Sequence, residues 1–318
     1  MEENGQNRHI RISLAYVIMI ILIWIPMARR KSLAFLDVGQ GDCFVADTKS
    51  GAIIFDGGSS SEDQVGRYRI LPYMKYLGYQ KIQIAVISHM DIDHYSGIKE
   101  LLEMGKIKYL GLPEIPKDET MKKIIGIAKK RGTTIFYLSR GRQITTKDGS
   151  LKVLHPQKNS QMEKNAASLV MQGKILGYRV LLTGDVEKEG EEELLSEELE
   201  RADILKAAHH GSKNSTSNEF LQKVQPKQTV ISCGKQNRYG HPHLETIHRL
   251  QTYHTKIYRT DRSGAIIFSK EEMVENLQKK GILSKAIERD AKNMKKILED
   301  IKTNTYERFY LSTGKKNI

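Results

Sequence analysis

Short apolar blocks recur along the middle of the chain, and most have the length of a strand rather than of a helix. Blocks of this length, bounded by Gly, Asp, Ser or Pro, are typical of buried β-strands. The pattern predicts strands at 33–38, 52–55, 82–88, 107–110, 134–138, 151–154, 169–172, 179–183, 204–207, 229–232, 256–258 and 265–269.

Between some of these strands the apolar residues recur at helical intervals of three and four. This spacing predicts helices at 70–79, 98–104, 121–131, 188–199, 218–223 and 244–252. Strands outnumber helices, and neighbouring strands often follow each other after a short loop. We therefore expect an α/β fold with two sheets rather than a regularly alternating barrel.

The N-terminal segment has a different pattern. Residues 12–28 form a run of 17 residues without a charge, flanked by Arg8 and Arg11 on one side and by Arg29, Arg30 and Lys31 on the other. Roughly 17–25 apolar residues span a membrane. Because no small-residue cleavage site follows the run, an uncleaved single-pass anchor is favoured over a signal peptide or a core helix. Basic residues on both flanks leave the side of the membrane open, and we expect the domain to lie outside the cytoplasm.

The C-terminal segment is charged and carries one apolar stripe. From Ile287 to Ile301, apolar residues recur at spacings of four and three, which predicts an amphipathic helix on its own domain or on a partner. The expected organisation is a tail and transmembrane anchor at 1–31, a single α/β domain at 32–269 and a helical extension at 270–318.

Composition and charge narrow the function classes. With 39% hydrophobic and 28% charged residues, the chain is globular rather than disordered or fibrous. Cys43 and Cys233, with no CxxC pair, exclude a disulfide scaffold and a thiolate zinc site. The 51 Lys and Arg against 38 Asp and Glu give a net charge of +13, which favours a polyanion such as nucleic acid, anionic lipid or a phosphorylated polymer.

Four potential metal ligands lie within six residues, directly after the strand predicted at 82–88. They are His89, Asp91, Asp93 and His94, in the sequence HMDIDH. Without a metal, so many polar groups on one tight turn would repel or desolvate each other without compensation. Carboxylate and neutral imidazole are natural metal ligands. The spacing lets His89 and Asp91 face one ion while Asp93 and His94 face a second.

This motif resembles the HxHxDH sequence of the metallo-β-lactamase fold, with Asp91 where the second His usually stands. Together with further motifs in order, the chain is similar to the C-terminal lactamase-like domain of ComEC-type DNA-uptake competence proteins. These motifs are DVGQGD at 37–42, FDGG at 55–58, NAASLV at 165–170, LTGD at 182–185, LKAAHHGS at 205–212 and NRYGHP at 237–242. The resemblance covers about 33–269 and implies an αββα sandwich with a metal site at one edge.

The resemblance also implies the remaining ligands. Asp185 is expected to bridge two divalent ions, although it is also placed to cap the helix predicted from residue 188. One of His209 and His210 is expected to complete the second site, and His209 is preferred. Because Asp91 adds an oxygen donor, the site is expected to bind Mn²⁺ or Mg²⁺ better relative to Zn²⁺ than a site with histidine there. Zn²⁺ stays a possible ion.

A two-metal site of this kind predicts attack of an activated water on phosphorus. Asp93 is expected to orient that water and accept its proton, and His241 to protonate the leaving group or bind phosphate. Substrate contacts are expected from polar residues of the motifs, namely Asn165, Ser168, Lys206, Ser212, Asn237, Tyr239 and His241.

Three functions fit this pattern. The first is a membrane-anchored metal-dependent phosphodiesterase, above all a nuclease acting on DNA independently of sequence, because no base-reading motif is present. The second is a phosphoesterase acting on wall polymers or small phosphoesters, and the third is a non-catalytic DNA-binding module. The complete ligand set argues against the third. A single span cannot form a DNA pore, so a role in DNA uptake would need a separate membrane channel.

Overall fold

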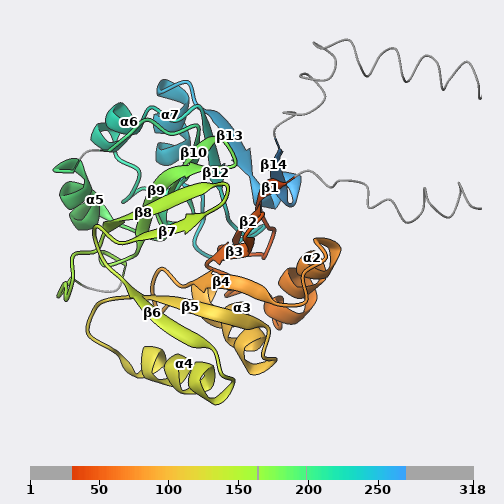
Figure 1. Cartoon of the computed structure of the whole chain (residues 1–318). Coiled ribbons are helices and arrows are strands. Elements are labelled where there is room, and N and C mark those ends of the chain that lie inside the picture. The colour runs from red at the N-terminus through yellow and green to blue at the C-terminus, as the bar shows by residue number, and fades with distance from the viewer. Residues whose placement is uncertain (1–30, 163–164, 198, 270–318) are drawn as a thin grey trace, which may run out of the picture. The chain divides into compact units, whose positions relative to one another are not determined.

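The computed structural model describes residues 31–162, 165–197 and 199–269, which form two seven-stranded sheets (Figure 1). The strand order of the first sheet is β14 (Ile266–Ser269), β1 (Ser32–Phe35), β2 (Phe44–Thr48), β3 (Gly51–Phe55), β4 (Ile82–Val86), β5 (Ile107–Pro113) and β6 (Thr134–Leu138). The order of the second sheet is β13 (Lys256–Arg259), β12 (Gln228–Ile231), β11 (Ile204–Lys206), β10 (Tyr178–Leu182), β9 (Val170–Ile175), β8 (Gly149–His155) and β7 (Gln143–Thr146).

Each sheet is part antiparallel and part parallel. In the first sheet, β14 to β3 pair antiparallel and β3 to β6 pair parallel. In the second sheet, β13 to β10 pair parallel and β10 to β7 pair antiparallel. In open sheets, loops after the carboxyl ends of parallel strands form ligand sites. The strands β3, β4, β10 and β11 all precede motifs that the sequence singled out.

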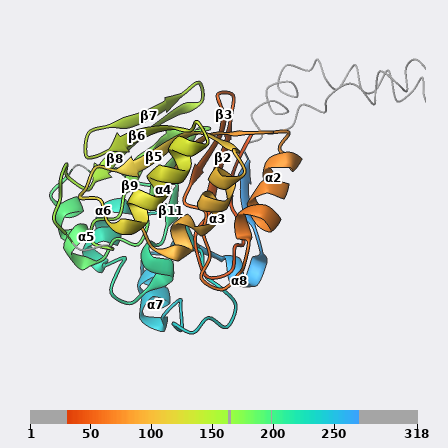
Figure 2. The ribbon, with the colours of Figure 1, turned by 90° about the horizontal axis from the view of Figure 1, so that it is seen from below.

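Helices cover the outer face of each sheet (Figures 1 and 2). On the first sheet lie the π-helical turn η1 (Gly66–Ile70) and the helices α2 (Leu71–Tyr76), α3 (Ile92–Glu103) and α4 (Glu119–Lys130). On the second lie α5 (Lys188–Leu195), α6 (Asn218–Val224) and α7 (Leu244–Thr252). Two short elements, the 3₁₀ turn η2 (Ala208–Gly211) and α8 (Thr260–Ser263), complete the described helices.

Side chains along the strands point alternately between the two sheets and toward the covering helices. In β1, Leu33 and Phe35 pack between the two sheets, whereas Ala34 faces the helices of the first sheet. In β3, Ile53 and Phe55 likewise point between the sheets. Because successive side chains of a strand point to opposite faces, fully buried strands have nearly continuous apolar sequences. The α/β fold with two sheets is therefore confirmed, as an αββα sandwich.

The sequence pattern missed two strands and misplaced one helix. The pattern predicts no strand at β2, whose apolar run directly follows the turn residues GQGD, and none at β7, which is short and largely polar. Helix α3 begins at Ile92 and not at residue 98. The pattern predicts too late a start because the first turn carries the polar ligand motif and has no apolar stripe. That turn is the one that matters for the site.

The predictions for the two ends of the chain concern residues outside the described ranges. These are the membrane anchor at 12–28 and the amphipathic helix within 270–318. Within the described ranges, no helix has both the length and the apolar character needed to cross a membrane.

Candidate metal centre

Four loops from both sheets meet at one edge of the sandwich. The loop after β3 supplies Asp56, the loop after β4 and the start of α3 supply residues 89–94, the loop after β10 supplies Asp185, and the turn after β11 supplies His210. Each loop follows a buried strand, so the strands fix where the ligand-bearing side chains start.

Backbone contacts hold the first turn of α3 in place. The N–H of Asp42 donates to the carbonyl of Asp93 at 3.0 Å, and the N–H of Gly57 donates to the carbonyl of His94 at 2.8 Å. At Gly58, a Cβ atom would lie 2.5 Å from the carbonyl oxygen of Ile92. The glycine after Asp56-Gly57 is therefore needed because a second loop runs directly against the ligand-bearing helix.

Three histidines share one arrangement, in which Nδ1 contacts the protein and Nε2 faces the centre. Nδ1 of His94 lies 2.9 Å from Oδ2 of Asp56, Nδ1 of His89 lies 3.0 Å from Oγ of Ser88, and Nδ1 of His210 lies 2.9 Å from the carbonyl of Ser232. All three Nε2 atoms are buried and have no hydrogen-bond partner among the described residues. Metal-binding histidines are held in this way, with the second nitrogen fixed by a protein acceptor.

The free Nε2 atoms converge on carboxylates. Oδ2 of Asp185 lies 3.2 Å from Nε2 of His94 and 3.3 Å from Nε2 of His210, and Oδ2 of Asp93 lies 3.3 Å from Nε2 of His210. Four groups of three ligand atoms are close enough to hold an ion: His89–His94–Asp185, Asp93–His94–His210, Asp42–Asp185–His210 and Asp42–Asp56–His94. Oδ2 of Asp91 lies 3.7 Å from Nε2 of His89 and adjoins the first group.

Buried negative charge also fits a cation. Asp42, Asp56 and Asp185 are at most 5% exposed, and among the described residues that contact them only Lys206 is a buried lysine or arginine. Burial would raise the pKa of Asp185, but His210 and His94 hold it well below its ordinary value. Burial would lower the pKa of His94, but Asp185 raises it well above. The cluster therefore draws positive charge, which divalent ions supply without protonating the imidazoles.

His209 and His210 differ in their placement. His210 is 1% exposed and belongs to an ion-binding group, whereas the side chain of His209 is 23% exposed, with Nε2 3.9 Å from Asp185 and Nδ1 2.9 Å from Glu187. The geometry therefore favours His210 as the ligand, against the preference for His209. The capping alternative for Asp185 does not hold, since the N-cap of α5 is Glu187.

Several residues expected to contact substrate lie behind the ligands instead. Lys206 is 4% exposed, pairs with Asp42 and lies 3.5 Å from Asp185. The buried hydroxyl of Ser168 accepts a hydrogen bond from the N–H of Asp185 at 3.3 Å. These side chains position ligands, because a buried group that already has partners cannot reach a polymer at the surface.

Two more of the expected substrate residues support loops. The hydroxyl of Ser212 accepts from the N–H of Asn214 at 3.3 Å and is 4% exposed. The side-chain amide of Asn237 donates to the carbonyls of Gly234 and His241, and its oxygen accepts from the N–H of His241 at 3.0 Å. Asn237 thus holds His241 in place rather than offering its own amide.

Four of the expected substrate residues are open to solvent or partly so: Asn165, Asn237, Tyr239 and His241. The ring of Tyr239 is 43% exposed and stacks on His241 with centroids 5.8 Å apart. Burial, and then the charges of His210 and His209, lower the pKa of His241 to about 4. At neutral pH its ring is therefore an uncharged hydrogen-bonding group rather than a cation that binds phosphate.

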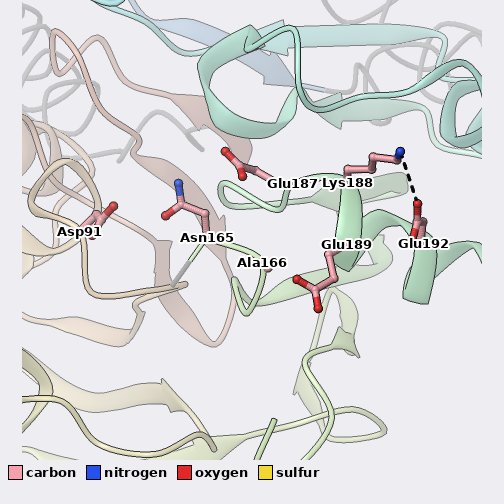
Figure 3. A pocket seen from close by; sticks show the side chains of 7 residues that line it. All are labelled: Asp91, Asn165, Ala166, Glu187, Lys188, Glu189 and Glu192. Atoms are coloured by element: carbon pink, nitrogen blue, oxygen red, sulfur yellow. Dashed lines mark ion pairs between the residues drawn. The ribbon is translucent and has the colours of Figure 1, made fainter. Parts of the chain in front are cut away.

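An open, acidic pocket lies on the Asp91 side of the centre. It has a volume of about 1110 Å³ and is lined by Asp91, Asn165, Ala166, Glu187, Lys188, Glu189 and Glu192 (Figure 3). Lys188 is paired with Glu192 at 3.9 Å, so it offsets little of the negative charge. This side of the centre is suited to a cationic or neutral group and not to a row of phosphates.

Sequence reasoning did not find every residue that shapes the site. Ser88, between the apolar strand and His89, carries no pattern that distinguishes it, and the carbonyl of Ser232 carries no sequence signal at all. His155, which lies outside the motifs of the resemblance, ends β8 and is fully buried. Its Nε2 lies 2.7 Å from the carbonyl of Ala166 and holds the 165–168 loop.

An αββα sandwich with histidine and carboxylate ligands at the edge where its two sheets meet defines a class of metal-dependent hydrolases. The chain belongs to this class: the model of the metallo-β-lactamase superfamily matches residues 36–235. The resemblance drawn from the motifs is thereby confirmed at the level of the superfamily.

The curated relatives carry the resemblance further. The chain is 35% identical over 269 residues to ComE operon protein 3 of Bacillus subtilis, covering 79% of this chain and 34% of that protein. It is 30% identical over 242 residues to Competence protein ComA of Neisseria gonorrhoeae, covering 73% of this chain and 31% of that protein. The match to the competence-type lactamase-like domain is thus confirmed, and the chain spans about a third of the length of these relatives.

Solved structures agree on the fold. The metallo-β-lactamase fold protein YhfI from Bacillus subtilis superimposes with a TM-score of 0.52 at 12% identity, over 74% of this chain and 99% of that one. The CmlA β-hydroxylase E377D mutant gives a TM-score of 0.51 at 11% identity, over 76% of this chain and 54% of that one. At such low identity the likeness concerns the fold alone.

Proposed function

We propose that this chain is a metal-dependent phosphodiesterase that cleaves DNA. The observation that carries the proposal is the convergence of the buried Nε2 atoms of His94 and His210 on the carboxylates of Asp93 and Asp185, with His89 in the same group of ligand atoms as His94 and Asp185. Two ions would be held by His89, Asp91 and Asp185 and by Asp93, His94 and His210, with Asp185 placed to contact both. The kinship with competence proteins and the charge of +13 support DNA as the substrate.

When bound, the ions would supply Lewis acidity toward a phosphoryl oxygen and an activated water. Compared with a ligand set that has histidine at position 91, the oxygen donor of Asp91 shifts the metal preference toward Mn²⁺, since hard ions prefer oxygen. Asp93 is the carboxylate of the second group, its side chain is 16% exposed, and it orients the attacking water. The neutral ring of His241 donates a hydrogen bond to the leaving oxygen.

In this proposal, residues 12–28 anchor the enzyme in a membrane, with the domain on the extracytoplasmic side. A separate membrane channel would then carry DNA that the enzyme has trimmed. Protease accessibility in intact cells tests the location: cleavage of the domain from outside supports it, and protection of the domain contradicts it.

The acidic pocket favours a second candidate function. A phosphoester with a cationic group, such as choline phosphate on a wall polymer, would place its ammonium beside Glu187 and Glu189 and its phosphate at the ligand cluster. DNA has no such cation. If the enzyme is a nuclease, the phosphate backbone of the bound DNA must therefore run away from this pocket.

A substrate panel tests the proposal on the full chain. The protein is stripped with chelator, reloaded with Mn²⁺ and assayed on single-stranded DNA, duplex DNA, bis-p-nitrophenyl phosphate and p-nitrophenylphosphorylcholine. We expect Mn²⁺-dependent cleavage of DNA. Faster hydrolysis of the choline ester than of DNA would favour the second candidate, and DNA binding without any hydrolysis would favour a non-catalytic module.

Matched carboxylate variants tie the activity to the centre. Asp185→Asn removes one charge from between three imidazoles and is expected to lower activity by at least ~100-fold, because even residues behind metal ligands cost 10–100-fold when changed. Asp63→Asn removes one charge from an exposed loop position and serves as the control, with activity unchanged.

A further inference from the structure

A second hollow is lined by His89 and shares no lining residue with the acidic pocket. It has a volume of about 240 Å³, room for roughly eight waters at about 30 Å³ each. Its lining residues are His89, Met90, Ile115, Pro116, Asp118, Met121, Ser160, Gln161 and Met162. We call it the methionine pocket. Because it borders a candidate metal ligand, a substrate at the centre has atoms within reach of it.

The lining selects a flat, uncharged group. Met90, Met121 and Met162 contribute three polarizable thioether side chains, which pack well against the faces and edges of aromatic rings. Ser160 and Gln161 add donors and acceptors that could meet polar ring edges.

The one carboxylate that lines the pocket already has a hydrogen-bond partner. Asp118 is the only acidic or basic side chain of its lining apart from the ring of His89, and its Oδ1 accepts the N–H of Met121 at 2.7 Å as the N-cap of α4. A phosphate finds no cation there. The pocket therefore fits the uncharged ring of a nucleotide and not its phosphate.

A basic surface begins where the pocket ends. Met121 lies in the first turn of α4, whose 12 residues span about 18 Å. Along and just after this helix stand five exposed cations, of which the first is paired with Glu119 at 2.7 Å: Lys122, Lys123, Lys129, Lys130 and Arg131. A strand with one base in the methionine pocket could therefore continue along the cations of α4, which attract phosphates, and not into the pocket lined by Glu187 and Glu189, which repels them.

We propose that the methionine pocket binds one unpaired nucleobase next to the scissile phosphodiester, so that the substrate is single-stranded DNA. This inference rests on the proposed phosphodiesterase function. A base within a duplex is stacked and paired and cannot enter a pocket unless it is extruded. A soft apolar lining without a fixed pattern of charges would accept any base, since every base offers a ring face, and so predicts binding that is independent of sequence.

An abasic scan of the substrate tests the proposal on the unaltered full chain with Mn²⁺. Single-stranded oligonucleotides carry one abasic site, moved position by position across a mapped cleavage site. We expect kcat/KM to fall about tenfold when the abasic site falls at one particular position beside the scissile phosphate, and to change little elsewhere. A flat profile, or duplex DNA cleaved as fast as single strands, would overturn the pocket.

A pocket-filling variant provides the second arm. Met162→Trp should abolish the preference for a base at that position, so that base-bearing and abasic oligonucleotides are cleaved at similar rates. Met104→Trp, at another half-buried methionine at the end of α3, is the control and should retain the preference. Retention of the preference in Met162→Trp would contradict the proposal, and if that variant does not fold, the abasic scan still decides.

Parallel binding measurements separate the two levels of the claim. Affinities of the same oligonucleotides are measured by fluorescence anisotropy in Ca²⁺. If nothing is hydrolysed in Mn²⁺, the proposed function fails, and the affinity profile still shows whether one base is selectively held. If hydrolysis occurs with a flat profile in both assays, only the methionine pocket fails.

Discussion

The consecutive histidines of the 209–210 pair make the sharpest test of the site, because they are chemically identical and placed differently. Both have positive φ angles, 48° for His209 and 53° for His210, in a region that costs non-glycine residues roughly 1–3 kcal/mol each. This backbone turns the ring of His210 inward, with Nε2 3.3 Å from both Asp93 and Asp185. His210→Ala should therefore remove a metal ligand, and His209→Ala should not.

The expected magnitudes follow from these positions. Residues that only orient a metal ligand cost 10–100-fold in metal affinity, so loss of the His210 ring should cost at least ~100-fold, or about 2.7 kcal/mol. Loss of its buried bond to the carbonyl of Ser232 lowers the free energy of unfolding by a further ~1–3 kcal/mol. His209→Ala breaks a partly exposed pair with Glu187, worth below about 1 kcal/mol, and should change activity by less than about tenfold.

The assay compares both variants with the parent chain by metal content, by Mn²⁺ titration calorimetry and by hydrolysis of single-stranded DNA. Melting temperatures with and without Mn²⁺ separate loss of the fold from loss of the ion. We expect Mn²⁺ to raise the melting temperature of His209→Ala as much as that of the parent, and that of His210→Ala by less. Loss of metal in His209→Ala with full retention in His210→Ala would refute the geometric assignment.

Asp91→His replaces an oxygen donor by a nitrogen donor and should move the metal preference from Mn²⁺ toward Zn²⁺; an identical ranking of ions in both proteins would count against the ligand role of Asp91. Asp56→Asn leaves the amide nitrogen facing either Nδ1 of His94 or the N–H of Ser88, so Mn²⁺ affinity should fall about 10–100-fold by calorimetry, and an unchanged affinity would show that Asp56 does not orient the ligand. The affinity for DNA should fall linearly on a log–log plot against salt, with a slope of ~0.7–0.9 per phosphate neutralised. Changing the five cations of α4 to Gln should flatten that slope, and a slope that does not change would exclude the helix as a DNA track. These cations are Lys122, Lys123, Lys129, Lys130 and Arg131.

The sequence predicted the layered fold because buried strands leave a strong apolar pattern, and it located the site because the ligand motifs follow those strands. The prediction of helices and strands failed where polar motif residues or turn residues mask the apolar pattern. The first turn of α3 is read as a loop because Asp93 and His94 point toward the centre and leave no apolar stripe. Strand β2 was lost because its apolar run directly follows the turn residues of GQGD.

The details of the site depend on three-dimensional contacts that no local pattern encodes. Lys206 and Ser168 are polar motif residues, which favours a role at the surface, yet both lie behind Asp185. Which of two adjacent histidines binds metal depends on backbone angles at a single turn. The methionine pocket joins residues 89–90, the start of α4 and residues 160–162, which are brought together only by the fold.

The most direct test of the central claim is a crystal structure of the Mn²⁺-loaded protein with anomalous diffraction recorded at the manganese edge. The account predicts two anomalous peaks, one among His89, Asp91 and Asp185 and the other among Asp93, His94 and His210. It also predicts that Asp185 lies within coordinating distance of both. No peak at this edge of the sandwich in crystals grown with saturating Mn²⁺, or a peak held by other residues, would contradict it.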